Sequence, residues 1–68
     1  MDKKISIILS TYNEAPFIVQ TINEILNNIK NVEIILVDDN SSDGTLEKVK
    51  NINNPNIKIF SRKFRGLA

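Results

Sequence analysis

The sequence predicts an α/β fold in which a Rossmann-like parallel sheet is built in the order β-α-β-α-β. Three short apolar runs, rich in β-branched residues, alternate with two segments in which apolar residues recur every three or four positions. Polar, turn-forming stretches separate these segments. Strands that alternate with helices are typical of parallel sheets joined by right-handed crossovers.

The first run, residues 4–10, is mostly apolar and predicts a strand that is buried on both faces. A polar break follows, and Pro16 suits the first turn of a helix, where its missing N–H is not needed. This helix should turn one apolar stripe toward the sheet, formed by Ile18, Ile22, Ile25, Leu26 and Ile29.

Two further strands are predicted at residues 32–37 and 57–60, and both are again short and apolar. A turn at residues 53–56 precedes the last strand, and residues 66–68 have the pattern of a beginning helix. A parallel sheet needs cover on both faces, and the chain supplies only two complete helices. We therefore expect residues 1–68 to be the N-terminal, incomplete part of a larger domain.

A short helix is predicted between these two strands, ending near Asn51. Ser42 or Asp43 can cap its first turn by accepting hydrogen bonds from backbone N–H groups. The apolar positions that should face inward are Leu46 and Val49.

Composition excludes several classes of function. The chain has 68 residues, enough for one small domain, with a net charge of +1, no Cys and no His. A disulfide, a Cys/His zinc site, haem ligation and nucleophilic catalysis by Cys or His are therefore excluded. The balanced charge argues against nucleic acid as a partner. The longest apolar run is too short to span a bilayer, no secretory cleavage site follows the first residues, and a Cys-free chain fits a reducing compartment.

Polar clusters follow each predicted strand, at residues 10–14, 38–45 and 62–66. Ligands of open parallel sheets bind at the carboxyl ends of the strands. We therefore expect the three clusters to meet at one rim of the sheet and to form a binding site there.

The second cluster also matches the start of a calcium-binding EF-hand loop, through Asp39, Ser41, Asp43 and Gly44. The twelfth loop position, however, is Lys50 where a bidentate Glu is needed, and a strand rather than a helix precedes the loop. For Asp43 and the two serines before it, helix capping and solvated turn positions are preferred to ligand contact. Gly44 is expected in or beside a tight turn.

Asp39 is the strongest candidate for ligand binding. A carboxylate at a strand end can accept hydrogen bonds from the N–H group of uracil or from the N1 and N2 edge of guanine, and such charge-assisted bonds are stronger than neutral ones. Asp38, one residue earlier in an extended segment, should point the opposite way. The pair is therefore not expected to act as a two-carboxylate acid/base dyad.

The other two clusters allow two interpretations each. Tyr12 can lie against a base or serve as a half-buried packing ring. Glu14 can bond a ribose hydroxyl or favour the positive end of the following helix. Arg62, Lys63 and Arg65 can meet phosphates, although a charged run on its own more often forms a solvated surface.

Two motifs of the chain resemble the opening of family 2 glycosyltransferases. They are Thr-Tyr-Asn-Glu at residues 11–14, after the first strand, and Ile-Leu-Val-Asp-Asp-Asn-Ser-Ser-Asp-Gly-Thr at residues 35–45. Residues 62–68, Arg-Lys-Phe-Arg-Gly-Leu-Ala, are similar to a segment of the polyprenyl-phosphate mannosyl- and glucosyltransferases, the dolichol-phosphate mannose synthase group.

The resemblance implies the A-type glycosyltransferase fold, a GDP- or UDP-sugar donor and a divalent metal, Mg²⁺ or Mn²⁺. For the subgroup it implies a polyprenyl phosphate acceptor, and a location in the cytoplasm or on the cytoplasmic face of the membrane. Ser10, Tyr12 and Glu14 fall on the strand end that contacts base and ribose in the family, and Asp39 falls on its base-binding Asp. Arg65 is assigned to the same nucleotide site from the basic cluster.

The chain departs from the family pattern in two ways. The family often has Pro where this chain has Ser10 or Thr11, so the resemblance does not define the shape of the first loop. The metal-binding Asp-x-Asp and the acid/base carboxylate of the family lie further along, and the 68 residues contain no Asp-x-Asp. Because metal ions neutralise the leaving pyrophosphate, we expect these residues alone not to catalyse transfer.

Two other classes of function are alternatives to a glycosyltransferase fragment. A stand-alone, non-catalytic nucleotide-binding module fits the same clusters at the rim. A receiver-like signalling domain would need an acidic pair after its first strand, and residues 11–14 supply Thr-Tyr-Asn-Glu there instead.

Overall fold

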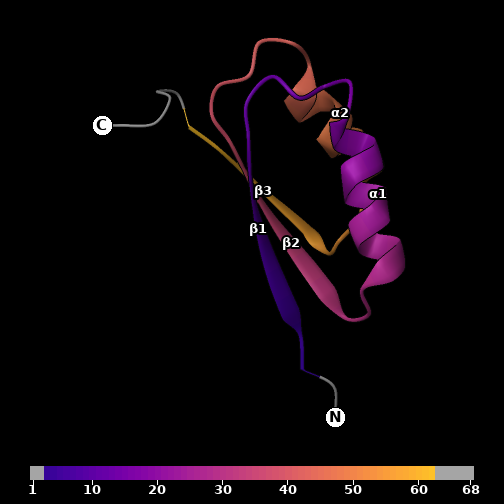
Figure 1. Cartoon of the computed structure of the whole chain (residues 1–68). Helices are drawn as coiled ribbons and strands as arrows, with labels where there is room; N and C mark the ends of the chain where they lie inside the picture. The colour runs from indigo at the N-terminus through magenta and orange to yellow at the C-terminus, as the bar shows by residue number, and fades with distance from the viewer. Residues whose placement is uncertain (1–2, 63–68) are drawn as a thin grey trace.

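The computed structural model describes residues 3–62 and confirms the predicted order of elements (Figure 1). The structure contains β1 (Ile5–Thr11), α1 (Ile18–Asn28), β2 (Val32–Asp38), α2 (Thr45–Ile52) and β3 (Ile57–Ser61). Each strand begins and ends within one residue of its predicted limits. The helix start expected at residues 66–68 lies outside the described residues.

The three strands form one parallel sheet in the order β1-β2-β3. In register, Thr11 at the end of β1 lies beside Asp38 of β2, and Asp38 lies beside Ser61 of β3. The carboxyl ends of all three strands therefore meet at one edge, the upper end of the sheet in Figure 1. This is the rim at which the polar clusters were expected.

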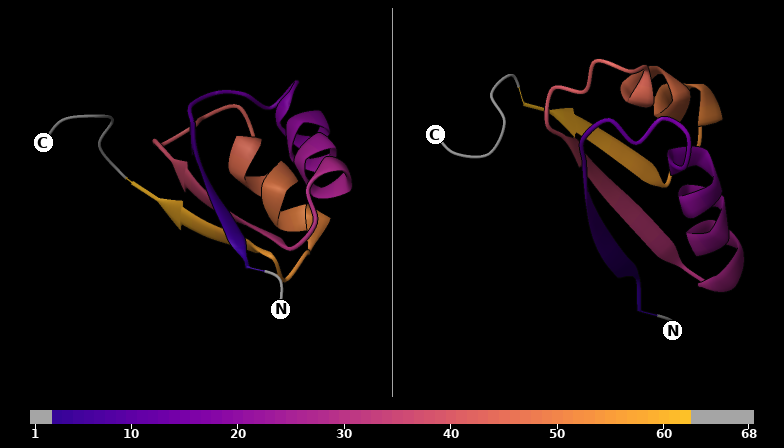
Figure 2. Two further views of the ribbon diagram at one scale, coloured as in Figure 1. Left: turned by 60° about the horizontal axis from the view of Figure 1, so that its bottom comes forward. Right: turned by 45° about the horizontal axis from the view of Figure 1, so that its top comes forward.

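Both helices cover the same face of the sheet (Figure 2). The strand order advances in one direction, so two crossovers of the same hand place their helices on the same side. The buried core lies in this single layer, where both helices meet the central strand. Its fully buried members are Ile18 and Ile22 of α1, Ile34 and Leu36 of β2, and Val49 of α2.

The prediction that the first strand is buried on both faces is wrong for the described residues. Side chains of β1 alternate, and Ile8 is 68% exposed on the face that carries no helix. On the same face Phe60 of β3 is 56% exposed, while Ile35 and Val37 of β2 are half-buried. The apolar sequence of β1 is that of a strand covered on two sides, but both helices of the described segment lie on one.

Backbone conformation at the loops depends on asparagine as much as on glycine. Gly44, immediately before α2, has a φ of +91°, as expected for a residue in a tight turn. Asparagine tolerates the left-handed region better than most residues because its short polar side chain bonds locally. Four asparagines adopt it at the ends of elements, with φ between 51° and 59°: Asn13, Asn31, Asn40 and Asn53.

The helix starts differ slightly from those predicted. Pro16 lies in the turn before α1, which begins at Ile18, and not inside the first helical turn. Backbone N–H groups of Phe17 and Ile18 both donate to the carbonyl of Glu14, so this turn leads directly into the helix. The turn predicted at residues 53–56 is confirmed, and there the side-chain oxygen of Asn54 accepts from the N–H of Asn56 at 2.8 Å.

The exposed apolar residues in the middle of the bare face, Ile8 and Phe60, predict that the chain self-associates. Static light scattering should give a mass above that of a monomer, because exposed apolar patches on a sheet favour association. Ile8→Gln should reduce the association without lowering the midpoint of thermal unfolding.

The matched control is Leu9→Gln, on the same strand but on the face that packs against the core. This variant should lower the unfolding midpoint. A monodisperse wild-type monomer with a sharp cooperative melt would contradict the prediction.

Candidate nucleotide-binding site

The loops that follow β1 and β2 are tied to each other through Asn13. Its backbone N–H donates to the Ser41 hydroxyl oxygen at 2.8 Å, and its side-chain oxygen accepts from the N–H of Ser42, also at 2.8 Å. The left-handed backbone of Asn13 turns both groups toward the second loop. Two loops distant in sequence are thereby held as one surface at the rim.

Asp43 makes the second connection between these loops. One carboxylate oxygen accepts from the N–H of Ala15 at 3.0 Å, and the other accepts from the N–H of Thr45 at 3.1 Å and from its hydroxyl at 2.5 Å. The Thr45 hydroxyl oxygen in turn accepts from the N–H of Glu14 at 2.9 Å. Asp43 accepts from an N–H of the first turn of α2, as was predicted of a capping residue, but the N-cap position itself is occupied by Gly44.

These hydrogen bonds, that of the Thr45 hydroxyl above all, lower the pKa of Asp43 below its ordinary value of 3.8. Hydrogen bonds to the ionised form of a carboxylate favour that form, and burial opposes it. Asp43 therefore holds its negative charge at neutral pH while it joins the start of α2 to the loop before α1.

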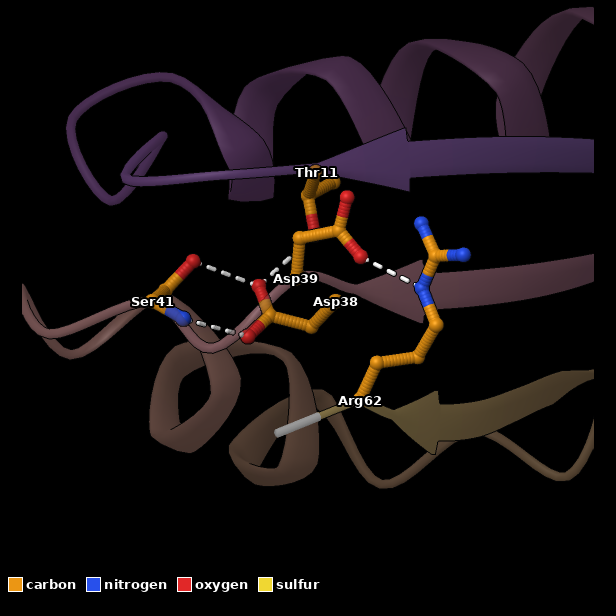
Figure 3. Close-up of polar contacts among 5 residues, drawn as sticks. All are labelled: Thr11, Asp38, Asp39, Ser41 and Arg62. Atoms are coloured by element: carbon orange, nitrogen blue, oxygen red, sulfur yellow. Dashed lines mark hydrogen bonds and ion pairs between the residues drawn. The ribbon is translucent and has the colours of Figure 1, made fainter. Parts of the chain in front are cut away.

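Asp38 is the buried polar centre of the rim (Figure 3). Its side chain is 1% exposed, and one oxygen accepts from the hydroxyls of Thr11 at 2.9 Å and Ser41 at 2.6 Å. The other oxygen accepts from the N–H of Ser41 at 2.9 Å. Asp38 thus joins the end of β1, the end of β2 and the loop beyond it.

Sequence reasoning assigned no role to Asp38. The signal was present in its spacing from Ser41, because an Asp side chain commonly bonds the backbone N–H of a residue two or three positions later in a turn. The hydroxyl of Thr11 could not be assigned to Asp38 without the strand register, which places the two residues side by side.

Asp39 points to the opposite face from Asp38, as predicted. Its backbone N–H donates to the carbonyl of Thr11 at 2.8 Å and so extends the ladder of β1 and β2 by one residue. Its carboxylate oxygen Oδ1 accepts from Nε of Arg62 at 2.5 Å, across the ends of β2 and β3 (Figure 3). The hydrogen bond and charge of Asp39 raise the pKa of the Arg62 guanidinium. Arg62, for which phosphate contact and a solvated surface were the two interpretations, is paired with the predicted base-binding residue.

Of the remaining predicted site residues, three lie at or just after the end of β1: Ser10, Tyr12 and Glu14. Ser10 is exposed and pairs in register with Val37, which lies two positions before Asp39. The side chains of Ser10 and Asp39 therefore lie on the same, bare face of the sheet. Tyr12 is 40% exposed, and the Glu14 side chain is exposed beside the start of α1. Both interpretations of these two residues therefore remain open. The predicted nucleotide-binding residue Arg65 lies outside the described residues.

A divalent metal is implied by the family resemblance, but residues 3–62 do not fit one. Within this range no group of three or more His, Cys, Asp or Glu side chains is arranged to hold a metal ion. The acidic residues at the rim are instead engaged by Thr11, Thr45 and Arg62. As to membranes, neither helix of the described segment has the length and apolarity to cross one.

The buried contact between Thr11 and Asp38 generates a test of stability. Thr11→Val keeps the shape of the side chain but removes a hydroxyl from a buried carboxylate, and should lower the free energy of unfolding by about 1–2 kcal/mol. Ser6→Ala is the control, because this hydroxyl also donates to a carboxylate across β1 and β2, that of Glu33 at 3.2 Å, but in an exposed place. It should cost less than about 0.5 kcal/mol in urea unfolding. Equal costs would contradict the central role given to Asp38.

The lowered pKa of Asp43 gives a dependence of stability on pH. A carboxylate whose pKa is lower in the folded state stabilises the fold above its unfolded pKa, and this stabilisation is lost as the pH falls through the folded value. Asp43→Asn should therefore unfold at lower urea concentration than the wild type at pH 7, and the difference should shrink as the pH falls below the ordinary value of 3.8 and through the lowered pKa of the folded state. Glu24→Gln, an exposed change on α1, controls for the loss of one negative charge. A difference that stays constant down to low pH would show that the charge of Asp43 is unimportant.

Comparison with known proteins identifies the family of this chain. The family described as Glycosyl transferase family 2 matches residues 6–68. The chain is 41% identical over 68 residues to cholesterol galactosyltransferase of Borreliella burgdorferi, covering 96% of this chain and 19% of that protein. It is 33% identical over 67 residues to chondroitin synthase of Pasteurella multocida, covering 94% of this chain and 7% of that protein. The chain therefore spans only a small part of these relatives.

A solved structure supports the same assignment. The chain is similar to a mannosyltransferase from Pyrobaculum calidifontis in complex with GDP-Man and Mn²⁺, with a TM-score of 0.81 and 26% sequence identity, over 96% of this chain and 21% of that one. The three parallel strands and their helices correspond to the N-terminal part of the A-type glycosyltransferase fold. The chain belongs to glycosyltransferase family 2.

Proposed function

We propose that this chain forms the base-binding half of the donor site of a glycosyltransferase that uses a GDP- or UDP-sugar. The observation that carries the proposal is Asp39, a carboxylate at the carboxyl end of the central strand, directed away from the buried Asp38. In this place it can accept hydrogen bonds from the N–H edge of guanine or uracil. Ser10, Tyr12 and Glu14 at the end of β1 are proposed to contact base and ribose, and Arg65 to lie near the phosphates.

The reaction proposed for the whole protein is transfer of the sugar to an acceptor such as polyprenyl phosphate, on the cytoplasmic side of the membrane. The GDP-Man and Mn²⁺ of the mannosyltransferase support a nucleotide-sugar donor and a divalent metal. The names of the relatives point to different acceptors, since one is named for cholesterol and another for chondroitin. Mg²⁺ or Mn²⁺ would be held by residues of the longer protein, since residues 3–62 contain no fitting cluster.

The 68 residues by themselves are proposed to bind nucleotide without transferring sugar. The sequence contains no Asp-x-Asp with which to hold a metal against the pyrophosphate. A stand-alone nucleotide-binding module is the second candidate, favoured by the way the two loops complete each other's hydrogen bonds within the described residues. Transfer of labelled sugar by a longer protein that carries this segment would decide between the two.

Asp39→Asn tests the base-binding assignment. The substitution replaces an acceptor oxygen with an NH₂ donor that faces the N–H edge of the base, and should weaken binding of GDP or UDP by about 1.5–3 kcal/mol. Titration calorimetry with both nucleotides measures it, in the chain and in a longer protein that carries the segment.

Glu33→Gln is the matched control for this test. Glu33 lies on the same strand and the same face, and is paired with Lys58 of β3 at 2.9 Å, but at the opposite end of the sheet. Its substitution should leave nucleotide affinity unchanged. If Asp39→Asn keeps the wild-type affinity for both nucleotides, Asp39 does not read the base.

A further inference from the structure

Arg62 lies against the carboxylate that the proposed function assigns to the base. The two side chains are anchored by the sheet itself, because the N–H of Arg62 donates to the carbonyl of Asp38 at 2.8 Å, just before Asp39. The ladder between β2 and β3 is thus extended beyond Ser61, the last residue of β3, and it places Arg62 beside Asp39 on the bare face. Their contact follows from strand register and not from a chance encounter of two long side chains.

The contact engages only part of each group. A single hydrogen bond joins Nε of Arg62 to Oδ1 of Asp39 at 2.5 Å. In Figure 3 the second carboxylate oxygen of Asp39 points away from this bond. No dashed line joins that oxygen, or the terminal nitrogens of the guanidinium, to another of the residues drawn. A carboxylate has about four lone-pair sites and a guanidinium five N–H donors. Asp39 can therefore receive a base N–H while it remains bonded to Arg62.

Burial shows which partner depends on the other. The Asp39 side chain is 16% exposed, whereas that of Arg62 is 49% exposed. A carboxylate that has lost most of its hydration needs a hydrogen-bond donor and an opposite charge beside it to offset the cost of burial. Arg62 supplies both from the solvent side, and its planar guanidinium fixes the direction of the hydrogen bond better than a flexible ammonium would.

We propose that Arg62 is a positioning residue for Asp39, which holds the carboxylate in its base-binding orientation before the nucleotide arrives and stays bonded to it afterwards. This inference rests on the proposed base-binding role of Asp39. A side chain that is already oriented loses less conformational freedom on binding, and this increases affinity. In the opposite arrangement, Arg62 would block Asp39 and the nucleotide would have to displace it.

Titration calorimetry with UDP and GDP separates these two arrangements. Arg62→Gln should weaken binding of whichever nucleotide the wild type binds by about fivefold, the scale of one net hydrogen bond. Arg62→Lys keeps the charge without the Nε donor, and its nucleotide affinity should lie between those of the wild type and Arg62→Gln. Lys58→Gln, which removes the Glu33 ion pair between the same two strands, should change affinity by less than about twofold. Thermal melts confirm that all three variants are folded.

A spectroscopic readout reports the contact itself. In a proton–nitrogen NMR spectrum the Nε–H signal of Arg62, assigned by its loss in Arg62→Lys, should be protected from exchange with water and should lose that protection in Asp39→Asn. It should stay protected when UDP or GDP saturates the site. A purely structural role for Arg62 would lower thermal stability without this coupling to the nucleotide.

The outcomes separate this inference from the proposed function. The positioning role is overturned if Arg62→Gln binds nucleotide as tightly as the wild type or more tightly, or if the Nε–H signal loses its protection when nucleotide saturates the site. In either case the base-binding assignment stands as long as Asp39→Asn binds weakly. Failure of the wild type to bind either nucleotide, in the chain and in a longer protein that carries it, overturns both.

Discussion

The buried carboxylate of Asp38 is the interaction on which the rim of this molecule depends. A carboxyl group that is almost fully removed from water is tolerated only when its oxygens have hydrogen-bond partners, and here Thr11 and Ser41 supply them. These partners come from the neighbouring strand and from the following loop. The same side chain therefore sets where β1 ends, where β2 ends and how the polar loop leaves the sheet.

The order of faces at the rim follows from this anchor. Because consecutive residues of a strand point to opposite sides, burying Asp38 toward the helices directs Asp39 toward the bare face. The second loop is then joined to the first by hydrogen bonds of Asn13 and Asp43, so the residues that follow β1 are bonded to those that follow β2. One aspartate is buried beneath the rim and its neighbour is paired with Arg62 on the other face, so two identical residues in succession have different surroundings.

The one-sided sheet relates this chain to the larger proteins of its family. Strands added in a single direction by crossovers of one hand place both helices on one face, and β1 and β3 are left as open edges of the described sheet. Ile8 and Phe60 on the other face are large apolar residues of the kind found in protein interiors, yet both are exposed. The chain covers 19% of its galactosyltransferase relative and 21% of the mannosyltransferase structure. Apolar residues in the middle of a second face are what a parallel sheet presents when further elements pack on it.

The sequence by itself determined the element order, the apolar stripe of the first helix and the identity of Asp39 as the outward carboxylate, because all three depend on local periodicity. Tertiary structure alone decided three other features. The bare face of β1 depends on which side the helices take, the pairing of Thr11 with Asp38 on strand register, and the pairing of Asp39 with Arg62 on the meeting of two strand ends 23 positions apart. A one-dimensional pattern shows which way a side chain points relative to its neighbours in sequence, but only the assembled sheet determines which distant side chain it meets.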